Sequence, residues 1–277
     1  LFKGKPNEVV IQDGVFSRTG CERIIRYAFE TARKEKRSLT SISKANALNY
    51  SMVFWDQIFQ ELSAEYPDVE THSYLVDAAS MFMVKDPSRF QVVVTSNLFG
   101  DILTDLGAAI AGGMGLAAGA NLNPERKYPS MFEPIHGSAP DIAGRGIANP
   151  MASVWAASQM LDFFGHEDWG TRVLEALEAV LEDGRILTPD LGGTASTSQV
   201  GDAIARKLAE RMFRELDPAR PVKLITYRAG VPEGEAARSL YQRLGFCPGR
   251  LVEVDGSPAQ EFLRPAEIPG SERSEAE

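Results

Sequence analysis

Two aspartates spaced four residues apart are the first feature of this sequence with a chemical use. Asp101 and Asp105 lie in the segment VVVTSNLFGDILTD, residues 92–105, where a β-branched run precedes a helical pattern. On a helix, residues four apart share a face, with β-carbons roughly 5–6 Å from each other. A divalent cation such as Mg²⁺ or Mn²⁺, which prefers carboxylate oxygens, would relieve their mutual repulsion. The alternative is a pair of solvated acids on a helix surface.

Three further residues have side chains suited to proton transfer or to holding a cofactor. His136 and Asp141 lie in the segment EPIHGSAPD, whose glycine and serine offer N–H groups and a hydroxyl to a nucleotide. Asp141 can accept hydrogen bonds from a ribose diol. Lys44 follows a short strand-like run and would exchange a proton if it were desolvated or close to other charges. Two of them have a plainer alternative, since a lone histidine is more often structural and an isolated lysine more often lies on the surface.

The segments that must position these residues alternate between strand and helix patterns. Strands are expected within residues 8–16, near the start of 38–51, within 70–74 and at the start of 92–105. Apolar periodicity predicts helices over residues 21–34, 50–65, 77–84, 151–164, 169–182 and 197–216. Asn97 is expected to cap the helix that carries the two aspartates. Strands alternating with helices are typical of an α/β protein.

Two glycine-containing stretches follow that helix. Residues 113–118, GMGLAA, nominally match a loose dinucleotide fingerprint, but they follow a helix and not a strand, so we interpret them as close packing. Residues 121–150, NLNPERKYPSMFEPIHGSAPDIAGRGIANP, are too long for a simple connection. Long irregular loops inside compact domains are usually functional, so this loop is the expected ligand-binding segment.

Composition excludes several classes of protein. A chain of 277 residues with 44% hydrophobic residues suits one large or two moderate globular domains. The net charge of −9 argues against non-specific nucleic-acid binding. Cys21 and Cys247 lie far apart, which predicts neither a disulfide framework nor a zinc site. With no membrane-length apolar run or visible signal peptide, the expected location is the cytoplasm. Leu1, in place of Met, predicts a chain that begins inside a longer reading frame.

Four blocks carry a specific resemblance: SISKANAL, SNLFGDILTDL, the loop at residues 121–150, and TPDLGGTASTSQVGDAI. They resemble the NAD-dependent β-decarboxylating dehydrogenases of hydroxy acids, which include isocitrate, 3-isopropylmalate, tartrate and D-malate dehydrogenases. The resemblance runs from about residue 1 to residue 210, and the loop is most similar to the tartrate and D-malate branch. It implies an α/β fold of the isopropylmalate dehydrogenase type.

The resemblance also implies roles for individual residues. Lys44 matches the catalytic lysine, which acts across a dimer interface. Asp77 from one subunit, with Asp101 and Asp105 from the other, matches the ligands of Mg²⁺ or Mn²⁺. The residues that match the cofactor loop are Glu133 on the nicotinamide side, and His136, Gly137, Ser138, Ala139, Asp141, Ile142 and Asn149 on the adenosine side. Asp141 followed by Ile142 resembles the NAD-dependent members, because NADP-dependent members carry a basic residue there.

The implied reaction is the oxidation and decarboxylation of a small 2-hydroxy acid, such as tartrate or D-malate, in a homodimer with shared active sites. Hydride passes to NAD, the metal polarises the new carbonyl and stabilises the enolate, and the lysine handles a proton. No nucleic-acid or membrane partner is implied.

The sequence departs from the family at its start. Family members first supply a glycine-containing strand and turn, arginines for the substrate carboxylates and an acid/base tyrosine, whereas this chain enters the pattern after them. We therefore expect an incomplete fold without the N-terminal part of the large domain, an exposed sheet edge and impaired activity. The alternative is a non-catalytic fragment that dimerises or binds a metal.

The sequence changes character near residue 213. Residues 236–246, AARSLYQRLGF, resemble the last helix and following strand of GNAT acyltransferases, with Tyr241 at the position of a frequent general acid. Because the glycine-rich pyrophosphate loop is missing, we expect a small GNAT-like α+β remnant and no acetyltransferase activity. A module derived from an acetyltransferase whose catalytic half lies elsewhere is the remaining alternative. The predicted division is 1–212 dehydrogenase-like, 213–265 GNAT-like and 266–277 a disordered tail.

Overall fold

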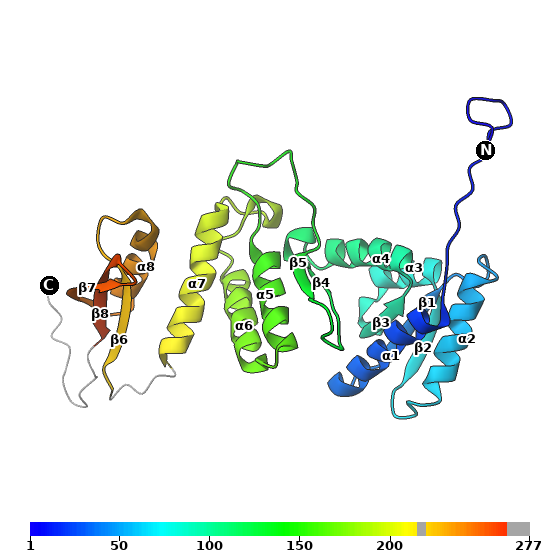
Figure 1. Ribbon diagram of the computed structural model, residues 1–277, viewed down its shortest axis with the longest axis horizontal. Coiled ribbons are helices and arrows are strands. Elements are labelled where there is room, and N and C mark those ends of the chain that lie inside the picture. Colours follow the sequence, from blue (N-terminus) through cyan, green and yellow to red (C-terminus); the bar gives the residue numbers. More distant parts are fainter. Residues whose placement is uncertain (215–219, 265–277) are drawn as a thin grey trace. The chain divides into compact units, whose positions relative to one another are not determined.

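The computed structural model describes residues 1–214 and 220–264 (Figure 1). The chain divides into two compact units, Leu1–Ala111 and Gly112–Glu277. Both cysteines are free, with Cys21 buried and Cys247 exposed. Within the described ranges, no helix has the length and apolar character needed to cross a membrane.

A parallel three-stranded sheet forms the centre of the first unit. Its strands are β1 (Leu39–Ser43), β2 (Thr71–Leu75) and β3 (Val92–Thr95), in the order β2-β1-β3. All five residues of β1 are buried, which is typical of a central parallel strand with both faces covered. The sheet and its helices confirm the α/β prediction.

Helices cover both faces of this sheet. On one face lie α1 (Arg18–Glu35) and α2 (Ser51–Ser63), packed around the fully buried Phe29. The Phe29 ring stacks on the rings of Phe59 and Tyr66, with centroid distances of 5.3 and 4.7 Å. On the other face, α3 (Val76–Lys85) and α4 (Asn97–Ile110) pack against Ile42 of β1. The short 3₁₀ turn η1 (Pro87–Arg89) leads into β3.

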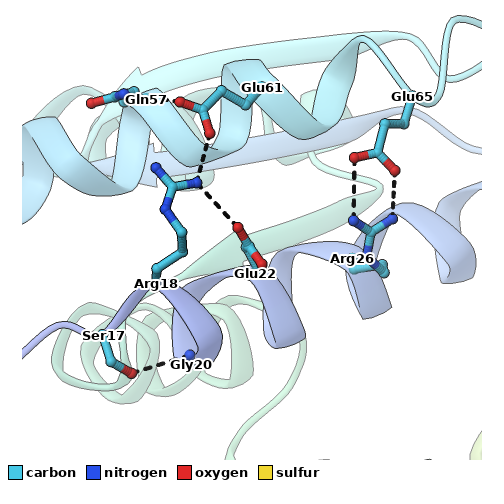
Figure 2. Close-up of polar contacts among 8 residues, drawn as sticks. All are labelled: Ser17, Arg18, Gly20, Glu22, Arg26, Gln57, Glu61 and Glu65. Atoms are coloured by element: carbon cyan, nitrogen blue, oxygen red, sulfur yellow. Dashed lines mark hydrogen bonds and ion pairs between the residues drawn. The ribbon is translucent and has the colours of Figure 1, made fainter.

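Ion pairs connect the exposed edges of α1 and α2, as Figure 2 shows. Arg18 contacts Glu22 of its own helix at 3.1 Å and Glu61 of α2 at 2.7 Å, and Arg26 contacts Glu65 at 2.7 Å. At the start of α1, the Ser17 hydroxyl accepts a hydrogen bond from the Gly20 N–H. Because these side chains are exposed, each pair contributes little to the stability of the fold.

The second unit begins with a hairpin and three long helices. Strands β4 (Ala118–Asn121) and β5 (Met131–Pro134) pair antiparallel, after the 3₁₀ turn η2 (Met114–Leu116). The helices are α5 (Met151–Phe163), α6 (Glu167–Asp183) and α7 (Thr197–Arg214), with the turn η3 (Pro189–Leu191) before α7. Their shared core contains Met151, Leu177 and Val200.

The C-terminal residues of this unit form a small α+β arrangement, as the sequence predicts. It consists of β6 (Val222–Tyr227), α8 (Pro232–Arg243), β7 (Cys247–Val254) and β8 (Ser257–Arg264), with an antiparallel sheet in the order β6-β8-β7. Phe246 and Phe262 are buried, and the Phe246 ring lies 4.9 Å from that of Phe213. The likeness to an acyltransferase and the domain boundaries stay predictions, and the predicted tail lies outside the described residues.

The structure differs from the prediction at two local points. Residues 8–16 form no strand; Val10 and Val15 there are 86% and 92% exposed. A strand needs a neighbour to share its backbone hydrogen bonds, and no described strand pairs with this segment. Asn97 is also not a cap: Ser96 precedes the helix in extended conformation, and Asn97 is its first residue. The helices predicted from periodicity are present, with ends shifted by a few residues, except that the predicted end of the last one, at residues 215–216, lies outside the described residues.

Candidate active site

Lys44 and Asp77 meet where two neighbouring strands end. Strands β1 and β2 run parallel, with Ser43 opposite Leu75, so the residues that follow them emerge at the same edge of the sheet. Lys44 comes directly after β1, and Asp77 lies in the first turn of α3. The Lys44 ammonium donates a hydrogen bond to the Asp77 carboxylate, with 2.5 Å between Nζ and Oδ1. The carboxyl edge of a parallel sheet is where α/β proteins bind ligands.

The two members of this pair differ in exposure. The Lys44 side chain is 26% exposed and that of Asp77 is 65% exposed. The hydrogen bond from Lys44 lowers the pKa of the Asp77 carboxyl, and a backbone hydrogen bond lowers it further. Asp77 therefore stays ionised and open to solvent, which a metal ligand requires, while Lys44 provides a proton donor held in place.

A second pair of polar contacts holds the end of β1. The Ser43 hydroxyl donates to the Asp56 carboxylate on α2, with 3.0 Å between the oxygens, and the Trp55 indole donates to the Ser41 hydroxyl. Burial raises the pKa of the Asp56 carboxyl, and the Ser43 hydrogen bond opposes that shift. Lys44 thus extends from a strand end anchored to a helix. Sequence reasoning missed Asp56, because nothing local distinguishes it from a surface acid.

Asp101 and Asp105 are exposed on α4, four residues apart as the sequence predicts. Helix α4 packs against α3, whose first turn carries Asp77. Within the described part of the chain, no three acidic, histidine or cysteine side chains lie close enough together to hold a metal. A single chain therefore does not bring Asp77 together with the aspartate pair, and their joint role as ligands stays a prediction.

The predicted cofactor residues lie along the end of the hairpin and the loop after it. Glu133 is exposed on β5, opposite Gly119 of β4. Farther along, Gly137, Ser138 and Asp141 are exposed, whereas the others are partly or fully buried. The His136 ring nitrogen Nδ1 lies 3.0 Å from the carbonyl oxygen of the next residue.

Tight turns shape the middle of this loop. Ala139 has a φ of +43°, in the left-handed region, and its carbonyl accepts a hydrogen bond from the Ile142 N–H. The Ile142 carbonyl in turn accepts one from the Arg145 N–H. These turns leave the Asp141 carboxylate exposed, where it is free to accept hydrogen bonds from a ribose.

Asn149 differs from the other predicted cofactor residues because it is buried. Its side-chain oxygen accepts a hydrogen bond from the Met151 N–H at 2.9 Å, and its Nδ2 donates to the Asp190 carboxylate at 3.0 Å. Both ends of the amide are thus used inside the protein. Close packing, which we expected of residues 113–118, is confirmed at Gly115: a β-carbon there would lie 2.5 Å from Asp190 Oδ2.

Comparison with known proteins gives consistent matches. The family described as isocitrate/isopropylmalate dehydrogenase matches residues 2–204. A probable tartrate dehydrogenase/decarboxylase of Bacillus subtilis (strain 168) is 49% identical over 202 residues, which cover 73% of this chain and 57% of that protein. The crystal structure of isocitrate dehydrogenase from Methylococcus capsulatus is 46% identical, with a TM-score of 0.68, over 71% of this chain and 58% of that one.

A further structural match extends beyond the family region. The crystal structure of the TT0538 protein from Thermus thermophilus is 27% identical, with a TM-score of 0.70 over 97% of this chain and 62% of that chain. This likeness therefore reaches past residue 204 into the C-terminal α+β part. The chain spans 57% of the length of the Bacillus subtilis relative. On the match over residues 2–204, the chain belongs to the isocitrate/isopropylmalate dehydrogenase family.

Proposed function

We propose that this chain carries the metal-binding and cofactor-loop part of an NAD-dependent, decarboxylating dehydrogenase of a 2-hydroxy acid such as tartrate or D-malate. The observation that carries the proposal is the Lys44–Asp77 pair at the carboxyl edge of the sheet, 2.5 Å apart. The relative in Pseudomonas putida named tartrate dehydrogenase/decarboxylase, 49% identical over 216 residues, supports the choice of substrate class.

The donor set suits a hard divalent cation. Asp77, Asp101 and Asp105 would supply carboxylate oxygens, which Mg²⁺ and Mn²⁺ prefer over nitrogen or sulfur ligands. The hydrogen bond from Lys44 lowers the pKa of Asp77 below its ordinary acidic value, which favours the ionised carboxylate that a metal ligand needs. When bound, such a cation supplies electrophilic stabilisation of negative charge on the substrate oxygen. The cofactor residues fit an NAD adenosine through the exposed Asp141 and the N–H groups of its loop.

Lys44 is the residue we assign to proton transfer. Its ammonium is held by Asp77, so its position at the strand end is set before substrate arrives. Held there, its Nζ is placed to exchange a proton with a substrate bound at this edge of the sheet.

A homodimer with shared active sites is part of the proposal. The resemblance assigns Asp77 and the aspartate pair to different subunits. In the structure, Leu98 and Ile102 on α4 are 66% and 56% exposed, on the same helix face as Asp101 and Asp105. Exposed apolar side chains beside a ligand pair suit an interface with a second copy. A cytoplasmic location is likewise our proposal.

Metal titration tests the proposed site. Isothermal calorimetry of the chain with Mn²⁺ should show saturable binding, and Asp101→Asn should weaken it by more than about tenfold, since one of few charged ligands is lost. Asp202→Asn, an equally exposed aspartate on α7, is the matched control and should leave the affinity unchanged. Equal Mn²⁺ affinity in the unaltered chain and Asp101→Asn would contradict the proposal.

A further inference from the structure

We infer that residues 188–197, TPDLGGTAST, hold the end of the cofactor loop in its binding conformation, and that Asp190 and Thr197 are positioning residues for the cofactor. This inference rests on the proposed function for its ligand, but its geometry stands on contacts within the second unit. The segment belongs to one of the blocks that mark the family resemblance. Two of its residues, Asp190 and Thr197, form hydrogen bonds with the end of the loop.

Asp190 provides the first contact. Its Oδ2 accepts a hydrogen bond from Asn149 Nδ2 at 3.0 Å, while the Asn149 oxygen accepts from the Met151 N–H at the start of α5. Asn149 is 8% exposed, so its amide has little access to solvent and depends on protein partners for its hydrogen bonds, although Asp190 itself is exposed. Asp190 therefore fixes the side chain of the residue where the loop ends and the helix begins.

Thr197 provides the second contact. Its N–H donates to the Gly146 carbonyl at 2.8 Å, and its hydroxyl donates to the Ala148 carbonyl at 2.5 Å. Thr197 is the first residue of α7, where backbone N–H groups have no acceptor inside the helix. The first residue of α7 thus binds the loop through a backbone N–H that has no acceptor within the helix.

Gly115, from a third segment of the chain, packs closely against Asp190 and Asn149. A β-carbon at Gly115 would lie 2.5 Å from Asp190 Oδ2 and 2.9 Å from the Asn149 β-carbon. Only a residue without a side chain allows the three segments to approach this closely. Gly115, in the stretch that nominally matches a dinucleotide fingerprint, thus packs against both members of the Asp190–Asn149 hydrogen bond.

Residues 188–197 also form backbone hydrogen bonds among themselves and with the residue before them. The Thr188 carbonyl accepts hydrogen bonds from the N–H groups of Leu191 and Gly193, each at 3.0 Å, and Ala195 donates to the Leu187 carbonyl at 2.9 Å. Thr188 is fully buried. A support that is ordered by its own bonds lowers the entropy lost when a loop binds its ligand.

Hydrogen exchange measured by mass spectrometry tests the inference directly. In the 277-residue chain, Asp190→Ala and Thr197→Val should speed amide exchange within residues 140–151 by roughly fivefold, since each removes one hydrogen bond from the loop. Asp190→Asn and Thr197→Ser keep an acceptor and a hydroxyl, so they should exchange like the unaltered chain. Ser198→Ala, an exposed neighbour, is the matched control.

Cofactor titration gives the second readout. The two loosened variants should bind NAD about three- to tenfold more weakly, while peptides of α6 keep their exchange rates, which separates loop positioning from general destabilisation. Unchanged exchange at residues 140–151 in both Asp190→Ala and Thr197→Val would overturn the inference. If one variant fails to fold, the other decides. Failure of the unaltered chain to bind NAD would instead count against the proposed function, because the exchange result does not depend on ligand.

Discussion

Individual ion pairs in this protein differ in how strongly their surroundings favour the charged form. Lys44 and Asp77 pair at a solvent-open edge, where the carboxylate is exposed and available to a ligand. Glu261 on β8 contrasts with them: its side chain is 6% exposed and contacts both Lys223 and Arg250. Hydrogen bonds from these two cations lower the pKa of Glu261 from 4.5 to about 2. The exposed Asp77 carboxylate is accessible to a ligand, whereas the buried Glu261 carboxylate contributes to the stability of the C-terminal sheet.

The Glu261 cluster predicts a pH-dependent stability of the C-terminal sheet. A carboxyl with a lowered pKa binds fewer protons in the folded state than in the unfolded state, so its contribution is present above pH 4.5 and is lost as the pH falls towards 2. Protection of β6 and β8 from hydrogen exchange should be greater in the unaltered chain than in Glu261→Gln at pH 7. This difference should shrink below pH 4.5 and close near pH 2.

Glu253→Gln on β7 serves as the control, because Glu253 is exposed and should show no comparable effect. A difference between the unaltered chain and Glu261→Gln that persists unchanged down to pH 2 would contradict the assignment of this stability to the ionised carboxylate.

At the scale of elements, the helix pair α1 and α2 sets the geometry from which Lys44 extends. Phe29 of α1 is fully buried and stacks on Phe59 of α2, while Asp56 of the same helix binds Ser43 at the end of β1. The apolar contacts between the helices therefore also position the carboxylate that accepts the hydrogen bond from the last residue of β1. Loss of that packing would therefore disturb the position of Lys44, although the packed rings lie on α1 and α2 and the lysine follows β1.

Removal of the Phe29 ring should show how much the packing between α1 and α2 contributes to stability. Phe29→Ala should lower the free energy of unfolding by about 3–5 kcal/mol, through lost burial and the cavity left behind. Urea unfolding followed by the fluorescence of Trp55, which is buried on α2, gives the measurement. Phe164→Ala removes the same side chain at a position that is 54% exposed, and its effect should be small. Equal effects of the two substitutions would contradict the packing argument.

At the scale of the whole molecule, the chain covers 57% of the length of the Bacillus subtilis relative, so the activity of a full-length enzyme does not transfer to it directly. The blocks in residues 1–277 contain the residues to which the resemblance assigns the roles of lysine, metal ligands and cofactor loop. We matched no residue here to the family's substrate-binding arginines or acid/base tyrosine, so our prediction for residues 1–277 tested alone concerns substrate positioning and proton transfer.

Activity should follow this division. We expect the 277-residue chain alone to show no more than barely detectable NAD reduction with D-malate, tartrate or isopropylmalate and Mn²⁺. A missing acid or base typically lowers a rate by about 10²–10⁴-fold, and lost substrate positioning lowers it further. A longer protein that includes the family's N-terminal segment should be active, and Lys44→Ala should abolish that activity. Robust turnover by the chain alone would contradict this expectation.

Local patterns in the sequence were sufficient for the helices and for the residues that could do chemistry. Apolar periodicity and spacing depend on residues a few positions apart. The helix that carries Asp101 and Asp105, and the position of both aspartates on one face of it, could therefore be predicted. The β-branched run at residues 92–95 and the α/β alternation were readable for the same reason. Close packing was correctly predicted at Gly115, because a dinucleotide fingerprint needs a preceding strand, whereas Gly113 has a positive φ and no close neighbour.

Only the tertiary structure decided which distant residues meet. Lys44 and Asp77 are 33 positions apart and pair because their strands are neighbours with a particular register. The burial of Asn149 and its contact with Asp190 depend on segments 41 positions apart, which no local pattern encodes. For the same reason residues 8–16 read as a strand yet form none: β propensity is local, whereas a strand exists only beside a partner.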